Sequence, residues 1–456
     1  MKRFFLKSYY SNYRPHYIPN IKLALPVVFS QGGQMVVGLA DTVMVGRLGA
    51  TELAAVSFAN GIFILGLVLS IGVAYGLTPL VGKAFGAGNR ELSAQWLKQG
   101  LVANVLFAVG LMFLMFLVGL LTKYMGQAEE VVSLARPYYY ILVLSVFPYV
   151  IFLVFKQFAE GITNTRIAMV ITLVANVLNI VLNYIFIFGK LGFPSWGLDG
   201  AGYATLVSRI VMGVLFVAAF VYLPFFNKYK RDCIGTRIQW TKVLEVIKVG
   251  FPIGGQMVIE VFAFSMGTLM MGWIDKDSLA AHQIVLSLAS LTYMMSVGLS
   301  SAATIKVSNY FGANDFHNLK YSAYAIIHKV IIFMAFNGVM FVLLRNELPR
   351  LFINDVNVVS IAAQLMVVAG VFQLFDGLQV TWLGILRGLQ DVNAPSVIAF
   401  VTWILIALPI SYLCAFVFEM NAVGIWIGYL IGLFVASFLL QIRYRKLYQK
   451  FNKYEC

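Results

Sequence analysis

Long apolar stretches separated by short polar ones dominate the chain. Four of them carry no charged residue, at Leu53–Gly82, Leu101–Leu121, Ile167–Gly189 and Met420–Ile442. A helix that crosses a lipid bilayer needs about 20 consecutive, mainly apolar residues. Because each of these stretches is at least that long, the pattern predicts membrane-spanning helices.

The whole pattern predicts twelve such spans. They are expected at residues 21–46, 53–80, 93–121, 134–156, 166–189, 200–224, 243–273, 278–305, 320–345, 356–386, 392–416 and 421–442. The composition agrees, since 61% of the residues are hydrophobic and 11% are charged, against about a quarter charged in soluble domains. The sequence therefore predicts an all-α polytopic membrane protein and excludes a water-soluble globule.

The net charge of +14 is unevenly distributed. With a cytoplasmic N-terminus, the cytoplasmic side collects twenty-five of the 33 Lys and Arg residues, about seven lie on the outer side, and one, Arg209, falls deep inside a span. Prominent on that side are Lys2, Arg3, Lys7, the loop 228–242 and the tail 443–453. This bias is the positive-inside pattern, which places both termini in the cytoplasm. The charge thus serves topology rather than nucleic-acid binding.

Neither a cleaved leader nor a cysteine site is indicated. The first apolar stretch is a full span, and no small-residue cleavage pattern precedes it. Cys233, Cys414 and Cys456 show neither paired spacing nor a metal-binding motif, so we assign them no function.

The chain contains an internal repeat with a constant offset of 226 residues. The matching pairs are Leu25-Pro26 with Phe251-Pro252, Leu53-Ala54-Ala55 with Leu279-Ala280-Ala281, and Phe85-Gly86-Ala87 with Phe311-Gly312-Ala313. Each copy holds six spans, an even number, so both copies enter the membrane from the same side. This predicts a parallel repeat with the substrate path between the two halves.

The repeat sets the expected domain organisation. The segments are a cytoplasmic N-terminal segment (1–20), an N-terminal six-helix lobe (21–224), a basic cytoplasmic linker (225–242), a C-terminal six-helix lobe (243–442) and a cytoplasmic tail (443–456). Pro26 and Pro252 lie early in the first span of each lobe. A proline there either bends the helix by removing a backbone hydrogen bond or is simply tolerated near its start.

Three acidic residues, Asp41, Glu260 and Asp376, lie well inside predicted spans. Each costs about 2.5–3.5 kcal/mol on insertion scales, a cost that usually indicates a function. From the helical rise, Glu260 and Asp376 both lie about 16–18 Å above the cytoplasmic boundary. Two carboxylates at one depth are expected to share a proton or bind a small cation, although two unrelated hydrogen-bonded groups would also fit.

Asp41 lies about 28 Å above the same boundary, too far away to join that pair. Asn179 and Asn183 on the fifth span and Thr205 on the sixth reach a comparable depth. One carboxylate with two amide oxygens and a hydroxyl would suit a proton or Na⁺. Hydrogen bonding between helices is the alternative role of the asparagines.

Other polar residues in the spans give weaker signals. Arg209 is either a buried partner or a side chain that reaches the membrane surface. His282 is expected to be a hydrogen-bonded structural histidine rather than a titrating one. The candidate lining of a substrate cavity is Gln34, Gln256, Met266, Gln283 and Gln373. Methionine suits varied apolar cations, but packing against lipid would explain it equally well.

Together these motifs make the chain resemble the multidrug and toxic compound extrusion family and, within it, the NorM-like branch. The resemblance covers essentially the whole chain and rests on Leu25-Pro26, residues 39–49 (LADTVMVGRLG), Leu53-Ala54-Ala55, Phe85-Gly86-Ala87 and residues 197–205 (GLDGAGYAT). It implies a two-lobed antiporter of the bacterial inner membrane. Such a protein exports bulky, mostly cationic or aromatic drugs in exchange for Na⁺ or H⁺ by alternating access.

The resemblance also implies roles for single residues. Asp41 with its two asparagines and Thr205 looks like the family's N-lobe cation site, and Glu260 with Asp376 looks like the C-lobe site of the NorM-like branch. Phe372 is a departure. Relatives can place a tyrosine one turn before the C-lobe aspartate, whereas this chain keeps the ring and loses the hydroxyl.

Three other functions remain open at this point. A lipid-linked saccharide flippase of the wider superfamily would favour a cationic cavity, whereas most buried charges here are acidic. A membrane enzyme would need convergent catalytic groups, yet the four histidines are scattered. A channel would not need two carboxylate sites.

The remaining expectations concern ions and partners. No cofactor is expected beyond the coupling ion. The oxygen ligands at Glu260 and Asp376 favour Na⁺ over H⁺ without excluding H⁺. We expect a monomer whose partners are the lipid bilayer and small-molecule drugs or toxic organic cations.

Overall fold

The computed structural model describes residues 2–452, with side chains for residues 12–451. Within this range twelve helices are long and apolar enough to cross a membrane. This confirms the predicted all-α fold and the number of spans. Lys453 and Cys456, which the sequence analysis assigned to the tail, lie outside the described residues.

The chain forms two compact units. One comprises Phe29–Gly254, and the other comprises the residues up to Val28 together with those from Gly255 onward. Two long helices, α1 (Lys2–Gly46) and α9 (Trp240–Ile274), therefore pass from one unit into the other. In each helix the division falls two residues after a proline, at Pro26 or Pro252. Proline removes a backbone hydrogen bond. Helices α1 and α9 therefore each have fewer backbone hydrogen bonds at the point where they cross from one unit into the other, here called the crossing point.

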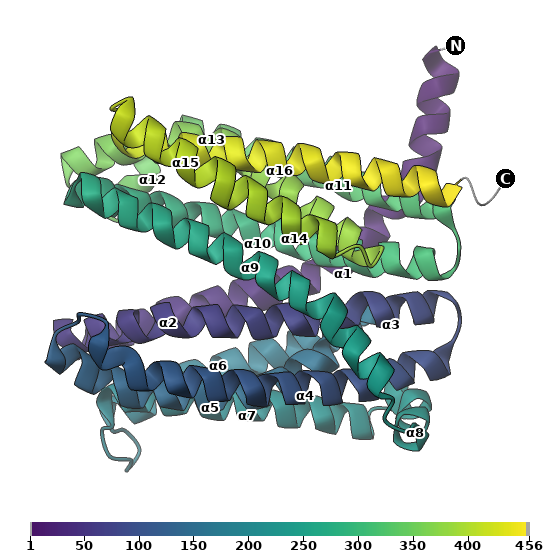
Figure 1. Ribbon diagram of the computed structural model, residues 1–456, viewed down its shortest axis with the longest axis horizontal. Coiled ribbons are helices and arrows are strands. Elements are labelled where there is room, and N and C mark those ends of the chain that lie inside the picture. Colours follow the sequence, from purple (N-terminus) through teal and green to yellow (C-terminus); the bar gives the residue numbers. More distant parts are fainter. Residues whose placement is uncertain (1, 453–456) are drawn as a thin grey trace. The chain divides into compact units, whose positions relative to one another are not determined.

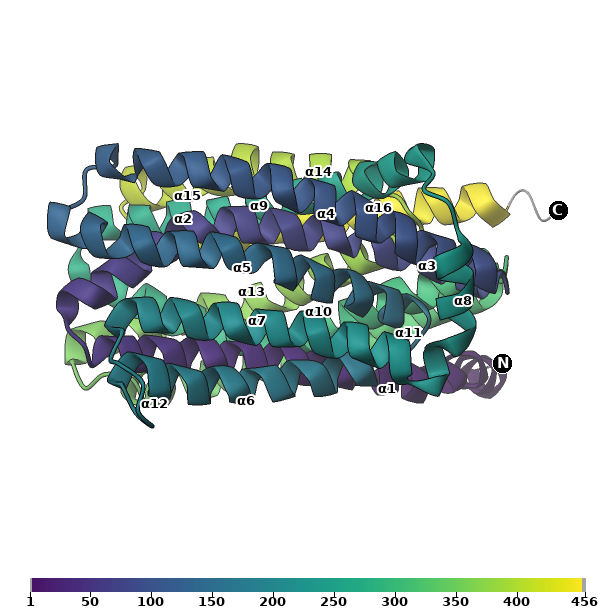
Figure 2. The ribbon, with the colours of Figure 1, turned by 90° about the horizontal axis from the view of Figure 1, so that it is seen from below.

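The unit Phe29–Gly254 is a bundle built around α5. Besides parts of α1 and α9, it contains α2 (Ala50–Tyr75), α3 (Leu77–Gly86), α4 (Arg90–Leu121), η1 (Thr122–Tyr124), α5 (Glu129–Gly161), α6 (Arg166–Phe188), α7 (Gly197–Tyr222), η2 (Pro224–Phe226) and α8 (Asn227–Gly235). Helix α5 packs against α2, α4 and α7, and Figure 2 shows α5 and α7 side by side. It is the most buried span, so its polar side chains are shielded from lipid.

The other unit is built around α13. Its helices after α9 are α10 (Lys276–Gly312), α11 (Phe316–Leu343), α12 (Glu347–Arg350), α13 (Val356–Gly388), α14 (Asn393–Phe400), η3 (Val401–Ala407), α15 (Leu408–Tyr412), η4 (Leu413–Val417) and α16 (Asn421–Asn452). Helix α13 packs against α10, α11 and α16, and Figure 1 shows α13 alongside α16. The segments η3 and η4 are π-helical. Such wide turns are rare and often mark functional regions.

The basic linker is folded rather than extended. Arg90 on α4 pairs with Asp232 on α8 at 3.0 Å, and the Lys98 ammonium donates to the Thr236 carbonyl at 2.5 Å. These contacts fix α8 against the start of α4. Burial raises the pKa of the Cys233 thiol on α8, so this cysteine stays protonated and unreactive at neutral pH.

Glycines allow two helix pairs to approach closely at equivalent positions of the repeat. In one unit a Cβ on Gly72 of α2 would lie 2.1 Å from the Gly254 Cα of α9. In the other a Cβ on Gly298 of α10 would lie 2.3 Å from a Val28 methyl carbon of α1. Both contacts lie next to the crossing points of α1 and α9, so any larger residue there would push the helices apart.

Candidate cation sites

Asp41 opens onto a cavity inside the unit Phe29–Gly254. The cavity has a volume of about 440 Å³. Its polar lining comes from α1, α2, α5 and α7, namely Asp41, Thr42, Asn60, Tyr138, Thr205 and Arg209. The structure thus brings Thr205 to the same cavity as Asp41, as the counted depths predicted.

Asn183, one of an asparagine pair on α6, holds the Asp41 carboxylate. The Asn183 amide donates to Asp41 Oδ1 and, at 3.0 Å, to Asn179 Oδ1. The two asparagines are four residues apart and so lie on one helix face. In the described part of the chain, Asn183 Oδ1 is buried without a hydrogen-bond partner. The amide thus presents its N–H to the carboxylate, and only a rotated amide would present the oxygen that a cation requires.

Arg209 is the second charged group of this cavity. Its Nη1 donates to Ser145 Oγ at 2.7 Å. Its guanidinium carbon lies 4.8 Å from the ring centre of Tyr149 and 5.4 Å from that of Phe63. Of the two roles that the sequence left open for Arg209, the structure shows a partnered side chain within the bundle. Gln34 adjoins these residues, since its side-chain amide lies 3.5 Å from the Tyr149 hydroxyl.

Glu260 lies in the other unit at the centre of an amide network. The side-chain amides of Gln256 and Gln379 both donate to Glu260 Oε1, at 3.0 and 2.6 Å. Arg387 Nη2 in turn donates to Gln256 Oε1 at 2.9 Å. The carboxylate is therefore stabilised by two neutral donors and indirectly by one cation.

Asp376 lies within electrostatic range of Glu260, as the equal depths suggested. Phe372, one turn earlier on α13, is buried and packs against Trp426 with ring centres 5.2 Å apart. Its ring therefore belongs to an aromatic cluster. Among the described residues, no three His, Cys, Asp or Glu side chains gather into a metal site. A cation here would have to rely on the two carboxylates and neighbouring amide oxygens.

The two halves carry different groups at equivalent positions. Gln34 matches Glu260 at the repeat offset of 226 residues, and Asp41 matches Gly267. A Cβ on Gly267 would lie 1.6 Å from the Tyr429 hydroxyl. Tyr429 thus leaves no space for a carboxylate there, and the candidate cation site of each half is of its own kind.

The remaining candidates are placed as follows. Gln373 is buried and accepts a hydrogen bond from Thr292 at 2.7 Å. Met266 is half-buried and Gln283 is exposed.

His282 accepts a hydrogen bond from the Trp426 indole at 3.2 Å and lies 3.1 Å from the Thr268 hydroxyl. Both ring nitrogens are therefore engaged, as expected for a hydrogen-bonded structural histidine.

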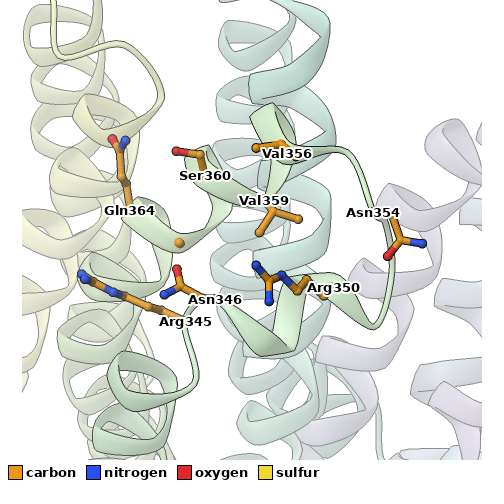
Figure 3. Close-up of a pocket in the computed structure, with 9 residues that line it drawn as sticks. Arg345, Asn346, Arg350, Asn354, Val356, Val359, Ser360 and Gln364 are labelled. Atoms are coloured by element: carbon orange, nitrogen blue, oxygen red, sulfur yellow. The ribbon is translucent and has the colours of Figure 1, made fainter.

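A polar cavity of about 550 Å³ lies at one end of the unit built around α13. Figure 3 shows Arg345 on one side, below Gln364 of α13, and Arg350 turned toward Asn346. Neither Glu260 nor Asp376 lines this cavity. It therefore does not belong to the candidate cation site of this unit.

One buried ion pair is not among the residues predicted from the sequence. Lys156 and Glu160 lie 3.8 Å apart on α5, and each side chain is 4% exposed. The predicted fourth span ended at residue 156, five residues before the end of the helix, and therefore left out Glu160. Helix α5 continues to Gly161, and its last turns pack against α3, where Thr78 donates to Gln157 Oε1 at 2.6 Å. The acidic residue just beyond the apolar run was the available signal.

Comparisons with known proteins agree with this architecture. The MatE family model matches residues 26–185 and again residues 252–413, one match in each half. The chain is 32% identical to the probable multidrug resistance protein NorM of Rhizobium meliloti, covering 95% of this chain and 94% of the relative. It is 30% identical to the multidrug resistance protein NorM of Photobacterium profundum, covering 95% and 96%.

Solved structures show the same fold. The Vibrio cholerae MATE transporter VcmN in its bent form is 18% identical with a TM-score of 0.86, covering 97% of this chain and 99% of that one. A multidrug resistance MATE family transporter of the MOP superfamily in an outward-facing conformation is 21% identical with a TM-score of 0.87, covering 95% and 96%. With its model matched in both halves and relatives aligned over nearly its full length, the chain belongs to the MatE family of membrane transporters.

Proposed function

We propose that this protein is a cation-coupled multidrug efflux antiporter that exports bulky, mostly cationic or aromatic compounds by alternating access. Relatives at about 30% identity over nearly the full chain are named multidrug resistance proteins. The observation that carries the proposal is the Asp41 carboxylate, which faces a cavity of about 440 Å³ within a membrane-spanning bundle. A buried carboxylate is costly in a membrane and marks an ion path.

The carboxylates supply a physical basis for coupling. When H⁺ or Na⁺ binds, Asp41 loses its net negative charge and attracts a cationic drug less strongly. Linkage requires the drug to weaken ion binding by the same factor. Glu260 with Asp376 forms the second proposed ion site, and its several oxygens favour Na⁺ there.

Proteoliposome transport tests this function and identifies the coupling ion. Purified protein is reconstituted with a cationic dye inside, and either a Na⁺ gradient or a pH gradient is imposed. Dye efflux driven by either gradient supports the antiport, and the effective gradient names the ion. Dye movement that ignores both gradients would refute coupling.

The proposal also includes the arrangement of the chain in the membrane. We propose a monomer in the bacterial inner membrane, with lobes at residues 21–224 and 243–442 and both termini cytoplasmic. The basic linker 225–242 supports this orientation through the positive-inside pattern. Labelling of a cysteine introduced at Lys190 by an impermeant reagent on intact cells tests it, since this loop would then face outward.

A further inference from the structure

Arg209 and Asp41 are opposite charges that share one cavity without pairing. Both side chains line the cavity of about 440 Å³, and the other lining residues in the described part of the chain are neutral. Yet the arginine donates to Ser145 and lies over two aromatic rings, while the carboxylate accepts from Asn183. Opposite charges attract strongly in a low-dielectric interior, so their separation calls for an explanation.

The groups around Arg209 form a site for a flat cation. The guanidinium carbon lies 4.8 Å from the Tyr149 ring centre and 5.4 Å from the Phe63 ring centre, within the distance at which cation–π attraction acts. Ser145 Oγ accepts one N–H bond at 2.7 Å. None of these three contacts requires a protein side chain, so an aromatic cation of another molecule would bind between the two rings equally well.

Arg209 is also within reach of the carboxylate. Thr205 lies one turn before Arg209 on α7, so both residues share a helix face, and both line the Asp41 cavity. A water molecule takes about 30 Å³, so the cavity leaves room for the long arginine side chain to change rotamer. Ser145 and the two rings hold it by contacts that water can replace.

We propose that Arg209 is a tethered internal cation that moves between the Phe63 and Tyr149 rings and the Asp41 carboxylate. This role rests on the antiport function proposed above. When the coupling ion leaves Asp41, Arg209 pairs with the bare carboxylate and frees the rings for a cationic drug. When the ion returns, it displaces Arg209 to the rings, and Arg209 displaces the drug.

This movement makes ion and drug mutually exclusive without direct contact between them. The titratable and charged groups that face Asp41 are few: Arg209 from α7 and Tyr138 from α5, with Tyr149 of α5 beneath the guanidinium. The α6 face contributes only the neutral asparagine pair. Among the described residues, Arg209 is therefore the sole positive side chain lining the cavity, and it can replace the coupling ion.

The test is binding of ethidium, a flat aromatic cation, to the purified full-length protein, followed by fluorescence anisotropy. Titrations are made across a pH series in Na⁺ and in K⁺. The variants are Arg209→Met, which keeps length but removes charge, and Arg209→Lys, which keeps charge but loses the planar group. Arg166→Met, at an exposed arginine starting α6, is the matched control. Monodispersity in gel filtration establishes folding for each variant.

In the wild type and in Arg166→Met, the coupling ion should weaken ethidium binding. In Arg209→Met we expect ethidium to bind about tenfold more tightly when the ion is present, because the internal competitor is gone. Any ethidium release that remains, through neutralisation of Asp41 itself, should have its midpoint at a higher pH, since a neighbouring positive charge no longer opposes proton binding. Arg209→Lys should retain the ion effect. In an Asp41→Asn background, Arg209→Met should no longer change the ion dependence.

Two failures are distinguishable. If the wild type shows ion-dependent ethidium binding and a folded Arg209→Met shows the same dependence and the same pH midpoint, the proposed role of Arg209 is wrong and the antiport stands. If Arg209→Met does not fold, loss of the ion effect in Arg209→Lys contradicts the role. If the wild type shows no ion dependence in binding or efflux, the antiport fails and the role of Arg209 fails with it.

Discussion

The buried pair of Lys156 and Glu160 should make a large and non-additive contribution to stability. Each side chain is 4% exposed and the charged atoms are 3.8 Å apart. Removing one partner leaves the other charge buried without its counter-ion, at a cost of about 3–5 kcal/mol. We therefore expect Glu160→Gln and Lys156→Met each to lower the free energy of unfolding by about that amount.

The double variant Lys156→Met with Glu160→Met should behave differently. Apolar side chains of similar volume remove both charges together, and replacing a whole buried pair is often neutral or stabilising. We expect the double variant to lie within about 1 kcal/mol of the wild type. In a cycle with the single variants Lys156→Met and Glu160→Met, the coupling energy between the two positions would then greatly exceed the roughly 0.5–3 kcal/mol usual for residues in contact.

Unfolding in detergent, followed by tryptophan fluorescence and by gel filtration after heating, measures these differences. Arg90→Gln is the matched control because Arg90 pairs with Asp232 while its side chain remains 45% exposed. Surface pairs contribute about 0–1 kcal/mol, so this control should change stability little. If Glu160→Gln costs no more than Arg90→Gln, or the double variant is as unstable as the singles, the account of the pair is wrong.

Three further predictions concern the ion sites and the helix crossing. Asp41→Asn should insert normally but lose dye efflux, because the amide keeps the shape and removes the ion-binding charge; efflux and surface expression are measured together, and wild-type efflux would exclude an essential carboxylate. Glu260→Gln and Asp376→Asn should each impair transport, and the double variant should be little worse than either single one because they act as one site; multiplied defects in proteoliposome rates would indicate independent roles. Gly72→Ala should cost about 1–3 kcal/mol through overpacking, since the added Cβ would lie 2.1 Å from a backbone atom, whereas Gly110→Ala meets nothing within 4 Å and should be neutral or stabilising. Equal melting temperatures for the two glycine variants would contradict the close approach of α2 and α9.

The fold could be predicted from the local pattern of apolar and polar residues. A lipid bilayer requires every backbone polar group to be satisfied within the span, so apolar length alone determines where helices form. Depth along a spanning helix increases in proportion to the number of residues. Counting residues therefore placed Thr205 at about the depth of Asp41, and both residues line the same cavity. The predicted end of the fourth span failed because hydropathy does not register burial by protein, and the end of α5 is buried against α3.

The sequence by itself determined the twelve spans, the repeat and the three acidic residues that lie within those spans, because membrane insertion acts on each segment separately. Only the tertiary structure decided which groups face those acids. Asn183 presents its N–H to Asp41, two glutamines engage Glu260, and Arg209 lies over aromatic rings. These contacts depend on the rotation of each helix about its axis, which is set by packing against its neighbours rather than by its own apolar length.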